Sequence, residues 1–298
     1  MRIYTYRLKG SEKEQIAVEF HKDSSKLIPV EQFGISCCDM TEFVKTMSAE
    51  KLAELKKKSE SEGVVMIDKA DTCPCAPISH PAQDIVCLGI NYSEHAIESA
   101  KYKADAFGGP REVPIYFSKR CNAAVEDGGK IPAHADIVDS LDYESELAVI
   151  IGKDAVNVKP EDAFDYIFGY TIINDVSART LQTSHKQWYF GKSLDGFTPM
   201  GPCIVTKDEF TVPPHLNIRS YVNGELRQNS NTALLLTDIP AIIAELTTGM
   251  TLKAGTIIST GTPKGVGMGF VPPKWLVPGD EVICEIEGIG RLRNQVTE

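Results

Sequence analysis

Three carboxylates on two apolar segments have the types and spacing of a site for a divalent cation. Glu144 and Glu146 are two residues apart in the run 141–151, so a strand there would point both side chains the same way. Two adjacent anions on a mostly buried strand repel each other and are costly to desolvate. A cation relieves both costs, and all-oxygen ligands suit Mg²⁺, Mn²⁺ or Ca²⁺ better than Zn²⁺. Asp175, which follows the apolar stretch 166–173, would supply a third carboxylate.

A purely structural interpretation of these acids stays open. Glu-x-Glu on a strand is often its solvated face, and Asp175 with Arg179 could form a surface ion pair worth roughly 0.3–0.5 kcal/mol. The apolar neighbours of Glu144 and Glu146 argue against full solvation.

A helix beginning at Asp175 would gather further polar groups. Asp175, Arg179, Gln182 and Lys186 then recur on one helix face. Three carboxylates and one divalent cation leave a formal charge of about −1, so an anionic substrate would need positive charge nearby. Arg179 and Lys192 are the candidates.

His95 and Glu98 have the spacing of a general base and the acid that orients it. At i and i+3 on a helix, the carboxylate can accept a hydrogen bond from the imidazole. That bond fixes the tautomer and raises the basicity of the other ring nitrogen. The competing interpretation is a helical histidine with an incidental acidic neighbour.

Two glycine-rich segments could hold ligand-binding groups. The loop 191–202 has four glycine or proline residues near its end and could hold Lys192 rigidly, although the lysine could simply be solvated. The segment 259–267 lacks Gly-Lys-Ser/Thr, and Phe270 stands where a dinucleotide fingerprint would need a third glycine. Its amides and hydroxyls could still bind a carboxylate.

Composition limits the class of protein. The chain has 298 residues, with 41 acidic and 31 basic side chains and a net charge of −10, which argues against nucleic acid or an anionic membrane as partner. No apolar run reaches the roughly 18 residues of a membrane span, and no signal-peptide core begins the sequence. The eight cysteines form no Cys-x-x-Cys, so zinc is not expected. A chain of this length can bury a core without disulfides, so we expect a reduced, cytoplasmic protein.

The elements that must position these residues are mostly strands, which predicts an α+β fold dominated by β-structure. Long helices do not alternate with the strands, and this disfavours a Rossmann or TIM arrangement. Helices are expected within 40–62, from a cap at Asn91 or Ser93, from 175, and at 239–246. Strands are expected at 1–8, 15–20, 64–67, 84–89, 115–118, 141–151, 166–173, 216–222, 225–228, 256–260, 281–287 and 291–296.

The sequence predicts two domains. The segment 69–83 holds three prolines and no periodicity, so we place the boundary there. Residues 1–78 would form a small separate unit, and residues 79–298 would carry the chemistry. Residues 107–111 are expected to form a turn.

Five segments together resemble the fumarylacetoacetate hydrolase family, in the manner of its acylpyruvase and 2-hydroxyhepta-2,4-diene-1,7-dioate isomerase members. Each segment is a weak signal alone, but all five occur in the family's order across about residues 80–298. They are 89–95, 143–147, 169–179, 191–197 and 261–267.

The resemblance implies a β-rich roll or sandwich, usually dimeric, with a small N-terminal α+β domain in some members. It implies that Mg²⁺ or Mn²⁺ is held by Glu144, Glu146 and Asp175, and that His95 and Glu98 activate water from a lid-like element. It further implies that the substrate site is lined by Arg179, Gln182, Lys192 and Thr262.

These features lead to three functional hypotheses. The first is a metal-dependent hydrolase that cleaves a C–C bond of a 2,4-dioxo acid such as an acylpyruvate, with a small-molecule 2-oxo acid as its partner. The second is a tautomerase, isomerase or decarboxylase of a 2-oxo diacid such as oxaloacetate. The third is a metal-stabilised binding module without catalysis, because one fold can host unrelated functions.

Overall fold

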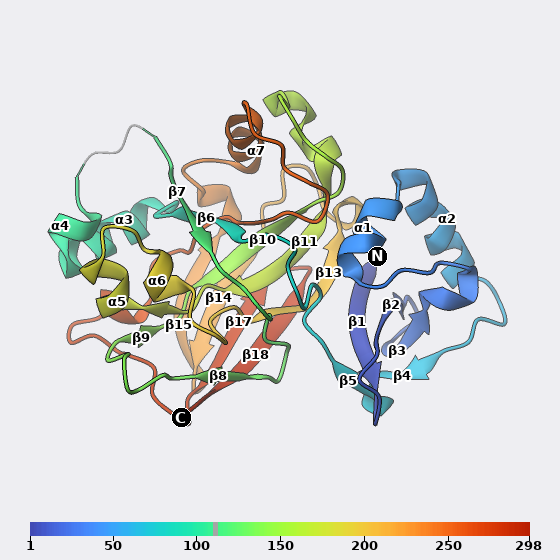
Figure 1. The fold of residues 1–298 in the computed structure, drawn as a ribbon, viewed down its shortest axis with the longest axis horizontal. Helices are drawn as coiled ribbons and strands as arrows, with labels where there is room; N and C mark the ends of the chain where they lie inside the picture. The colour runs from blue at the N-terminus through green and yellow to red at the C-terminus, as the bar shows by residue number, and fades with distance from the viewer. Residues whose placement is uncertain (110–112) are drawn as a thin grey trace.

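A large mixed sheet runs through the molecule (Figure 1). The computed structural model describes residues 1–109 and 113–298. Within them, eleven strands form this sheet, which is antiparallel except where β16 and β6 pair in parallel. The order in space is β4 (Ile67–Asp68), β3 (Asp23–Pro29), β2 (Glu14–Phe20), β1 (Arg2–Leu8), β13 (Met200–Thr206), β11 (Ile167–Asn174), β10 (Ser145–Ile151), β16 (Ile257–Ser259), β6 (Ile85–Gly89) and β7 (Ile115–Lys119), with β5 (Thr72–Pro74) paired to β1.

A second sheet packs beside the first and completes the core. Strands β14 and β15 are joined by Asn223 and Gly224, both at positive φ as a type I′ turn requires, which confirms the predicted hairpin. The predicted closing hairpin is likewise present as β17 and β18. The strand order is β15 (Glu225–Asn231), β14 (Asn217–Val222), β17 (Glu281–Ile286), β18 (Gly290–Thr297) and β8 (Lys130–Pro132), while β9 (Leu141–Asp142) pairs with β12 (Ser177–Ala178).

The helices are short and lie outside the sheets (Figure 1). They are α1 (Met40–Thr46), α2 (Ala49–Ser59), α3 (Ser93–Tyr102), α4 (Ala104–Phe107), α5 (Arg179–Ser184), α6 (Tyr189–Lys192) and α7 (Ile239–Thr247). Short 3₁₀ turns cover Val30–Phe33, Lys69–Asp71, Pro160–Tyr166, Lys207–Glu209, Thr232–Leu234 and Gly267–Gly269. The predicted β-rich α+β class is confirmed.

Three local predictions were wrong. Helix α3 is not capped by Asn91 or Ser93, because Tyr92 takes the cap position and the Asn91 side chain instead bonds Thr237 and Thr260. No helix begins at Asp175, because the chain stays extended through β12 first. Lys186 therefore lies beyond α5.

The predicted strand 141–151 is broken. Its residues form β9 and β10 as separate strands, and Tyr143 and Glu144 lie between them. The predicted turn at 107–111 falls partly on residues 110 and 111, outside the described part of the chain.

The large sheet connects the two predicted domains. Strand β1 pairs with β13 through Arg2 and Ile3, opposite Val205 and Ile204. One hydrophobic cluster also contains residues from both sides of position 78, among them Phe43 and Phe168, whose rings lie 6.3 Å apart. The division into 1–78 and 79–298 stays a prediction. Among the described residues, no helix is long and apolar enough to cross a membrane.

Candidate metal centre and active site

The pairing of β10 with β11 brings the three predicted metal ligands together. Ser145 lies opposite Asn174, so Glu144 just before β10 meets Asp175 just after β11, and the Asp175 amide donates to the Glu144 carbonyl at 2.8 Å. Each of Glu144, Glu146 and Asp175 offers one carboxylate oxygen within 4.8 Å of the others. All three side chains are buried.

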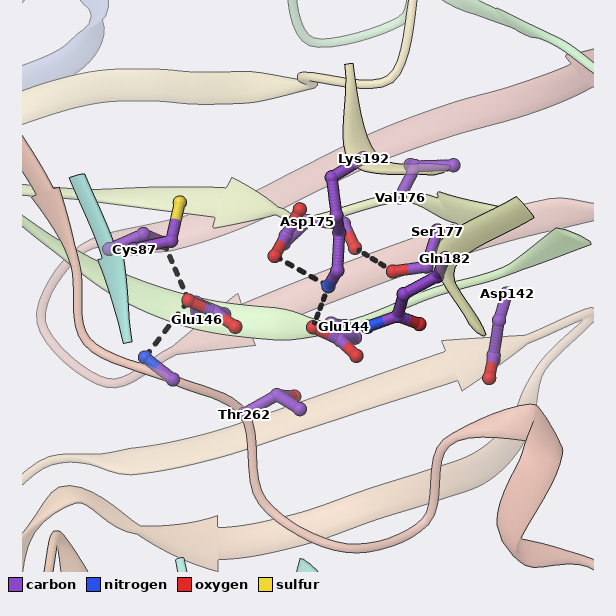
Figure 2. A network of polar contacts seen from close by, with 12 residues as sticks. Cys87, Asp142, Glu144, Glu146, Asp175, Val176, Ser177, Gln182, Lys192 and Thr262 are labelled. Atoms are coloured by element: carbon purple, nitrogen blue, oxygen red, sulfur yellow. Dashed lines mark hydrogen bonds and ion pairs between the residues drawn. The ribbon is translucent and has the colours of Figure 1, made fainter. Parts of the chain in front are cut away.

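Two of these carboxylates are already paired with protein cations. Figure 2 shows Lys192 reaching between Glu144 and Asp175, and its Nζ lies 2.7 Å from Glu144 Oε2 and 2.7 Å from Asp175 Oδ2. Arg179 Nη1 lies 2.7 Å from Glu144 Oε1, and Lys119 Nζ lies 2.7 Å from Asp175 Oδ1. No sequence pattern pointed to Lys119, which comes from β7 and is completely buried.

The opposite charges keep both Glu144 and Lys192 ionised. Burial alone would raise the pKa of Glu144, but the charges of Lys192 and Arg179 hold that pKa below its ordinary value. Burial would likewise lower the pKa of Lys192, but Asp175 and Glu144 raise it above its ordinary value. The Lys192 ammonium is therefore a fixed positive charge inside the site.

Glu146 differs from its two neighbours because no ion pair reaches it within the described residues. It accepts hydrogen bonds from Ser259 Oγ at 2.6 Å and from the Gly261 amide at 2.9 Å. Burial, and then the charges of Asp175 and Glu144, raise the pKa of Glu146 well above its ordinary value. Positive charge is thus lacking beside one of three converging carboxylates, and this oxygen-only donor set fits Mg²⁺ or Mn²⁺.

His95 and Glu98 form the predicted pair on α3. His95 Nδ1 lies 3.0 Å from Glu98 Oε2, and the imidazole is buried. Because an ionised carboxylate only accepts, Nδ1 carries the proton of this bond and Nε2 keeps its basic lone pair. Ser99 Oγ lies 3.3 Å from Nε2, a contact that the sequence analysis missed although i and i+4 are neighbours on a helix.

One enclosed cavity joins the base to the carboxylates. Its free volume is about 10 Å³, near the space needed for one water molecule. Trp188, Phe107 and Phe117 form an aromatic wall, and a Cβ on Gly89 would overlap the Trp188 ring. Of the predicted site residues, the lining includes His95, Glu144, Glu146, Arg179, Gln182, Lys192 and Thr262.

Two of the predicted substrate-binding residues are engaged with protein groups. Gln182 Oε1 accepts from Arg179 Nη1 at 3.1 Å. The Thr262 hydroxyl donates to the Ser145 carbonyl at 3.0 Å and accepts from Gln228 Nε2 at 2.7 Å. The structure thus gathers all the predicted site residues in one region, while their individual roles stay predictions.

Asp142 is a buried acid that the sequence analysis did not single out. Its Oδ2 accepts from Arg179 Nε at 2.8 Å, and Oδ1 accepts from the Gly267 amide at 2.6 Å. Asp142 therefore holds the same guanidinium that contacts Glu144. Its distance in sequence from Arg179 and Gly267 explains why no local pattern revealed it.

Comparisons with known proteins agree with this geometry. Residues 84–297 match the family model described as fumarylacetoacetate (FAA) hydrolase C-terminal. The chain is 45% identical over 249 residues to the oxaloacetate tautomerase YisK of Bacillus subtilis (strain 168), covering 83% of this chain and 81% of that protein.

Solved structures share the whole fold. A fumarylacetoacetate hydrolase from the psychrophilic Exiguobacterium antarcticum is 36% identical with a TM-score of 0.81, over 100% of this chain and 99% of that one. A maleylpyruvate hydrolase from Sphingobium sp. SYK-6, in complex with manganese(II) ion and pyruvate, is 27% identical with a TM-score of 0.76, over 100% and 99%.

The β-rich fold and the buried acidic triad define an enzyme with a candidate divalent-metal centre. The chain belongs to the fumarylacetoacetate hydrolase family, as its sequence motifs predicted.

Proposed function

We propose that the chain is a divalent-metal-dependent tautomerase of a compact 2-oxo diacid such as oxaloacetate. The observation that carries this proposal is the His95–Glu98 pair, at 3.0 Å, beside the same small cavity as Glu144 and Glu146. The 45% identical relative named as an oxaloacetate tautomerase supports tautomerisation ahead of the hydrolysis that the sequence analysis placed first.

Glu144, Glu146 and Asp175 would hold the Mg²⁺ or Mn²⁺ ion. A bound ion would act as a Lewis acid toward the oxygens of the 2-oxo acid and so make its C3 protons more acidic. The proposal covers either metal ion, Mg²⁺ or Mn²⁺.

The proton transfers fall to side chains of this chain. His95 Nε2 takes a proton from C3 of the keto form, and the C–H electron pair becomes the C2–C3 double bond. The His95 imidazolium then gives up that proton and the C2 oxygen gains one, which yields the enol and regenerates the neutral base; the reverse sequence restores the ketone. Lys192, a fixed cation on the cavity wall, stabilises negative charge that develops on oxygen during the exchange.

Replacing His95 tests the assignment. We expect His95→Ala to slow keto–enol exchange of oxaloacetate by about 10²–10⁴-fold, because a positioned base contributes that much. Ultraviolet absorbance follows the enol, and Mn²⁺ titration checks that the metal still binds. A rate equal to that of the wild type would remove His95 from the reaction and overturn the proposal.

A second candidate is hydrolysis of a C–C bond in a 2,4-dioxo acid. It is supported by the similar maleylpyruvate hydrolase, whose structure holds manganese and pyruvate. His95 would take a proton from water, and the resulting hydroxide would attack C4. The C3–C4 bond would then break with its electron pair on C3, which a proton quenches. Acetylpyruvate would yield acetate and pyruvate, whereas a pure tautomerase would leave the carbon chain intact.

The assembly is part of the same proposal. We expect a homodimer, as the family resemblance implies, acting on a small-molecule 2-oxo acid. Light scattering on the purified chain measures the mass of the assembly directly.

A further inference from the structure

The glycine-rich segment 264–269 binds carboxylates, but they belong to the protein itself. The Gly265 amide donates to Glu98 Oε1 at 2.9 Å and to Oε2 at 3.2 Å. The Gly267 amide donates to Asp142 Oδ1 at 2.6 Å, and the Met268 amide donates to Oδ2 at 3.1 Å. Three amides of one short segment, those of Gly265, Gly267 and Met268, therefore bind two separate acids.

The missing side chains make room for both acids. A Cβ on Gly269 would overlap Glu98 Oε1 and the carboxyl carbon behind it. A Cβ on Gly267 would lie 2.7 Å from Asp142 Oδ1 and would overlap the Lys274 carbonyl. Only glycine at these positions lets the two carboxylates come within hydrogen-bond distance of the segment.

Each acid leads to a different half of the candidate site. Glu98 bonds the Nδ1 of His95 and so orients the base. Asp142 bonds Arg179, which in turn contacts Glu144. The segment thus contacts both Glu98, which orients the base, and Asp142, which holds the arginine.

We propose that residues 265–269 form a carboxylate-binding loop that sets the position of His95 relative to the acidic triad. Gly265, Gly267 and Gly269 are positioning residues, because they act through Glu98 and Asp142 and not on the substrate. Charge-assisted bonds from backbone amides are strong and hold an acid at a defined place. The reaction served by this positioning rests on the proposed function, whereas the placement of Glu98 does not.

Gly269→Ala is the sharpest probe of the loop. The three atoms nearest to the added methyl group all belong to the flexible Glu98 side chain, so the backbone can remain while Glu98 is displaced. We expect kcat to fall by about 10–100-fold, the usual cost of losing a partner that orients a site residue. The affinity for Mn²⁺ should be unchanged.

A double-mutant cycle with Glu98→Ala separates this mechanism from general damage. In the Glu98→Ala background the clashing atoms are gone, so adding Gly269→Ala should change kcat less than twofold. A further large loss in the double variant would show that the glycine acts by another route and would overturn the inference. A Gly269→Ala variant with the kcat of the wild type would overturn it as well.

Hydrogen exchange gives a readout that does not depend on turnover. Gly269→Ala should speed exchange of the amides of α3 (Ser93–Tyr102), and it should add nothing in the Glu98→Ala background. Glu94→Ala is the matched control, because Glu94 also ties α3 to this segment, through Lys264, but lies on the exposed surface. This control should keep the kcat of the wild type.

The two proposals fail in different ways. A wild-type chain that turns over neither oxaloacetate nor acetylpyruvate would overturn the proposed function. Unchanged exchange of α3 in Gly269→Ala would overturn the positioning role, whatever the substrate.

Discussion

At the scale of single residues, Glu146 is the most unusual of the three converging acids. Glu144 and Asp175 are paired with lysine and arginine, while no ion pair reaches Glu146 among the described residues, and it accepts hydrogen bonds from Ser259 and the Gly261 amide. Ionising a buried carboxyl group that has no cation beside it is costly, so Glu146 binds its proton tightly.

This leads to a pH-dependent prediction for the metal-free protein. Because folding raises the pKa of Glu146 above its ordinary 4.5, unfolding above that pH releases a proton, and rising pH then favours the unfolded chain. Glu146→Gln removes this proton release. With both proteins in EDTA, we expect the melting temperature of Glu146→Gln minus that of the wild type to rise as the pH goes from 5 to 8.

Metal reverses the comparison. With Mn²⁺ added at a concentration that saturates the wild type, only the wild type should gain stability. Losing a group that merely orients a ligand costs roughly 10–100-fold in metal affinity, and Glu146→Gln should cost more because it removes a ligand. Equal Mn²⁺ affinity for the two proteins would contradict the role of Glu146 as a ligand.

Trp188 sets a second prediction at this scale, because its ring fills part of the cavity wall above Gly89. Trp188→Phe should enlarge the cavity and favour longer acids. We expect the ratio of kcat/KM for maleylpyruvate over oxaloacetate to rise about 10-fold, the order expected when pocket size changes. Trp275→Phe serves as control, since that ring packs on Tyr102 and does not line the cavity. An unchanged ratio would mean that another part of the wall limits substrate length.

Local spacing indicates a residue of this site only where its partner is close along the chain, whereas Asp175 and Lys192 were candidates for their charge and Thr262 was named through the family resemblance. Glu144 with Glu146, and His95 with Glu98, are visible because a strand or a helix repeats at those spacings. Lys119 and Asp142 are invisible, because each reaches its partner only after distant strands have paired.

At the scale of elements, most predicted strands exist, but β3 (Asp23–Pro29) and β13 (Met200–Thr206) were missed because polar, glycine and proline residues interrupt their apolar pattern. The apolar runs that became β10 and β11 are unmistakable, because both faces of these strands are buried. The break at Tyr143 and Glu144 was missed because β9 and β10 belong to different sheets, and periodicity along the chain does not show where the partner strand changes. The expected helix at Asp175 failed because pairing of β12 with β9 keeps that segment extended.

Strand β11 offers a test of the scaffold itself. At Gly169 a Cβ would overlap the Val205 carbonyl of neighbouring β13. Gly169→Ala should therefore destabilise the protein by about 1–3 kcal/mol, as overpacking does, and this appears as a lower urea midpoint. Gly224→Asn is the comparison, because that turn has open space at positive φ and should change stability by less than about 1 kcal/mol.

At the scale of the whole molecule, one sheet links the N-terminal segment to the family region. The family match begins at residue 84, just after the proline-rich stretch where the sequence predicts a boundary, and that boundary stays a prediction. Composition cannot reveal that β1 pairs with β13, because that pairing joins residues about 200 positions apart.

This continuity predicts the behaviour of a shortened chain. A protein containing only residues 79–298 would expose the edge of β13 and the apolar face that Ile3 and Phe43 cover. We expect it to aggregate or unfold at a lower temperature, while the full chain unfolds in one calorimetric transition. A stable, monodisperse fragment with Mn²⁺ affinity equal to that of the full chain would show that residues 1–78 are an independent unit.

The ammonium of Lys192 has a consequence for how the enzyme is loaded. It already spans Glu144 and Asp175 at 2.7 Å from each, so the pocket is electrostatically assembled before any ion arrives. A divalent ion that enters the triad would meet carboxylates whose charge is already partly balanced, so we expect the protein to reach its folded state before any metal binds.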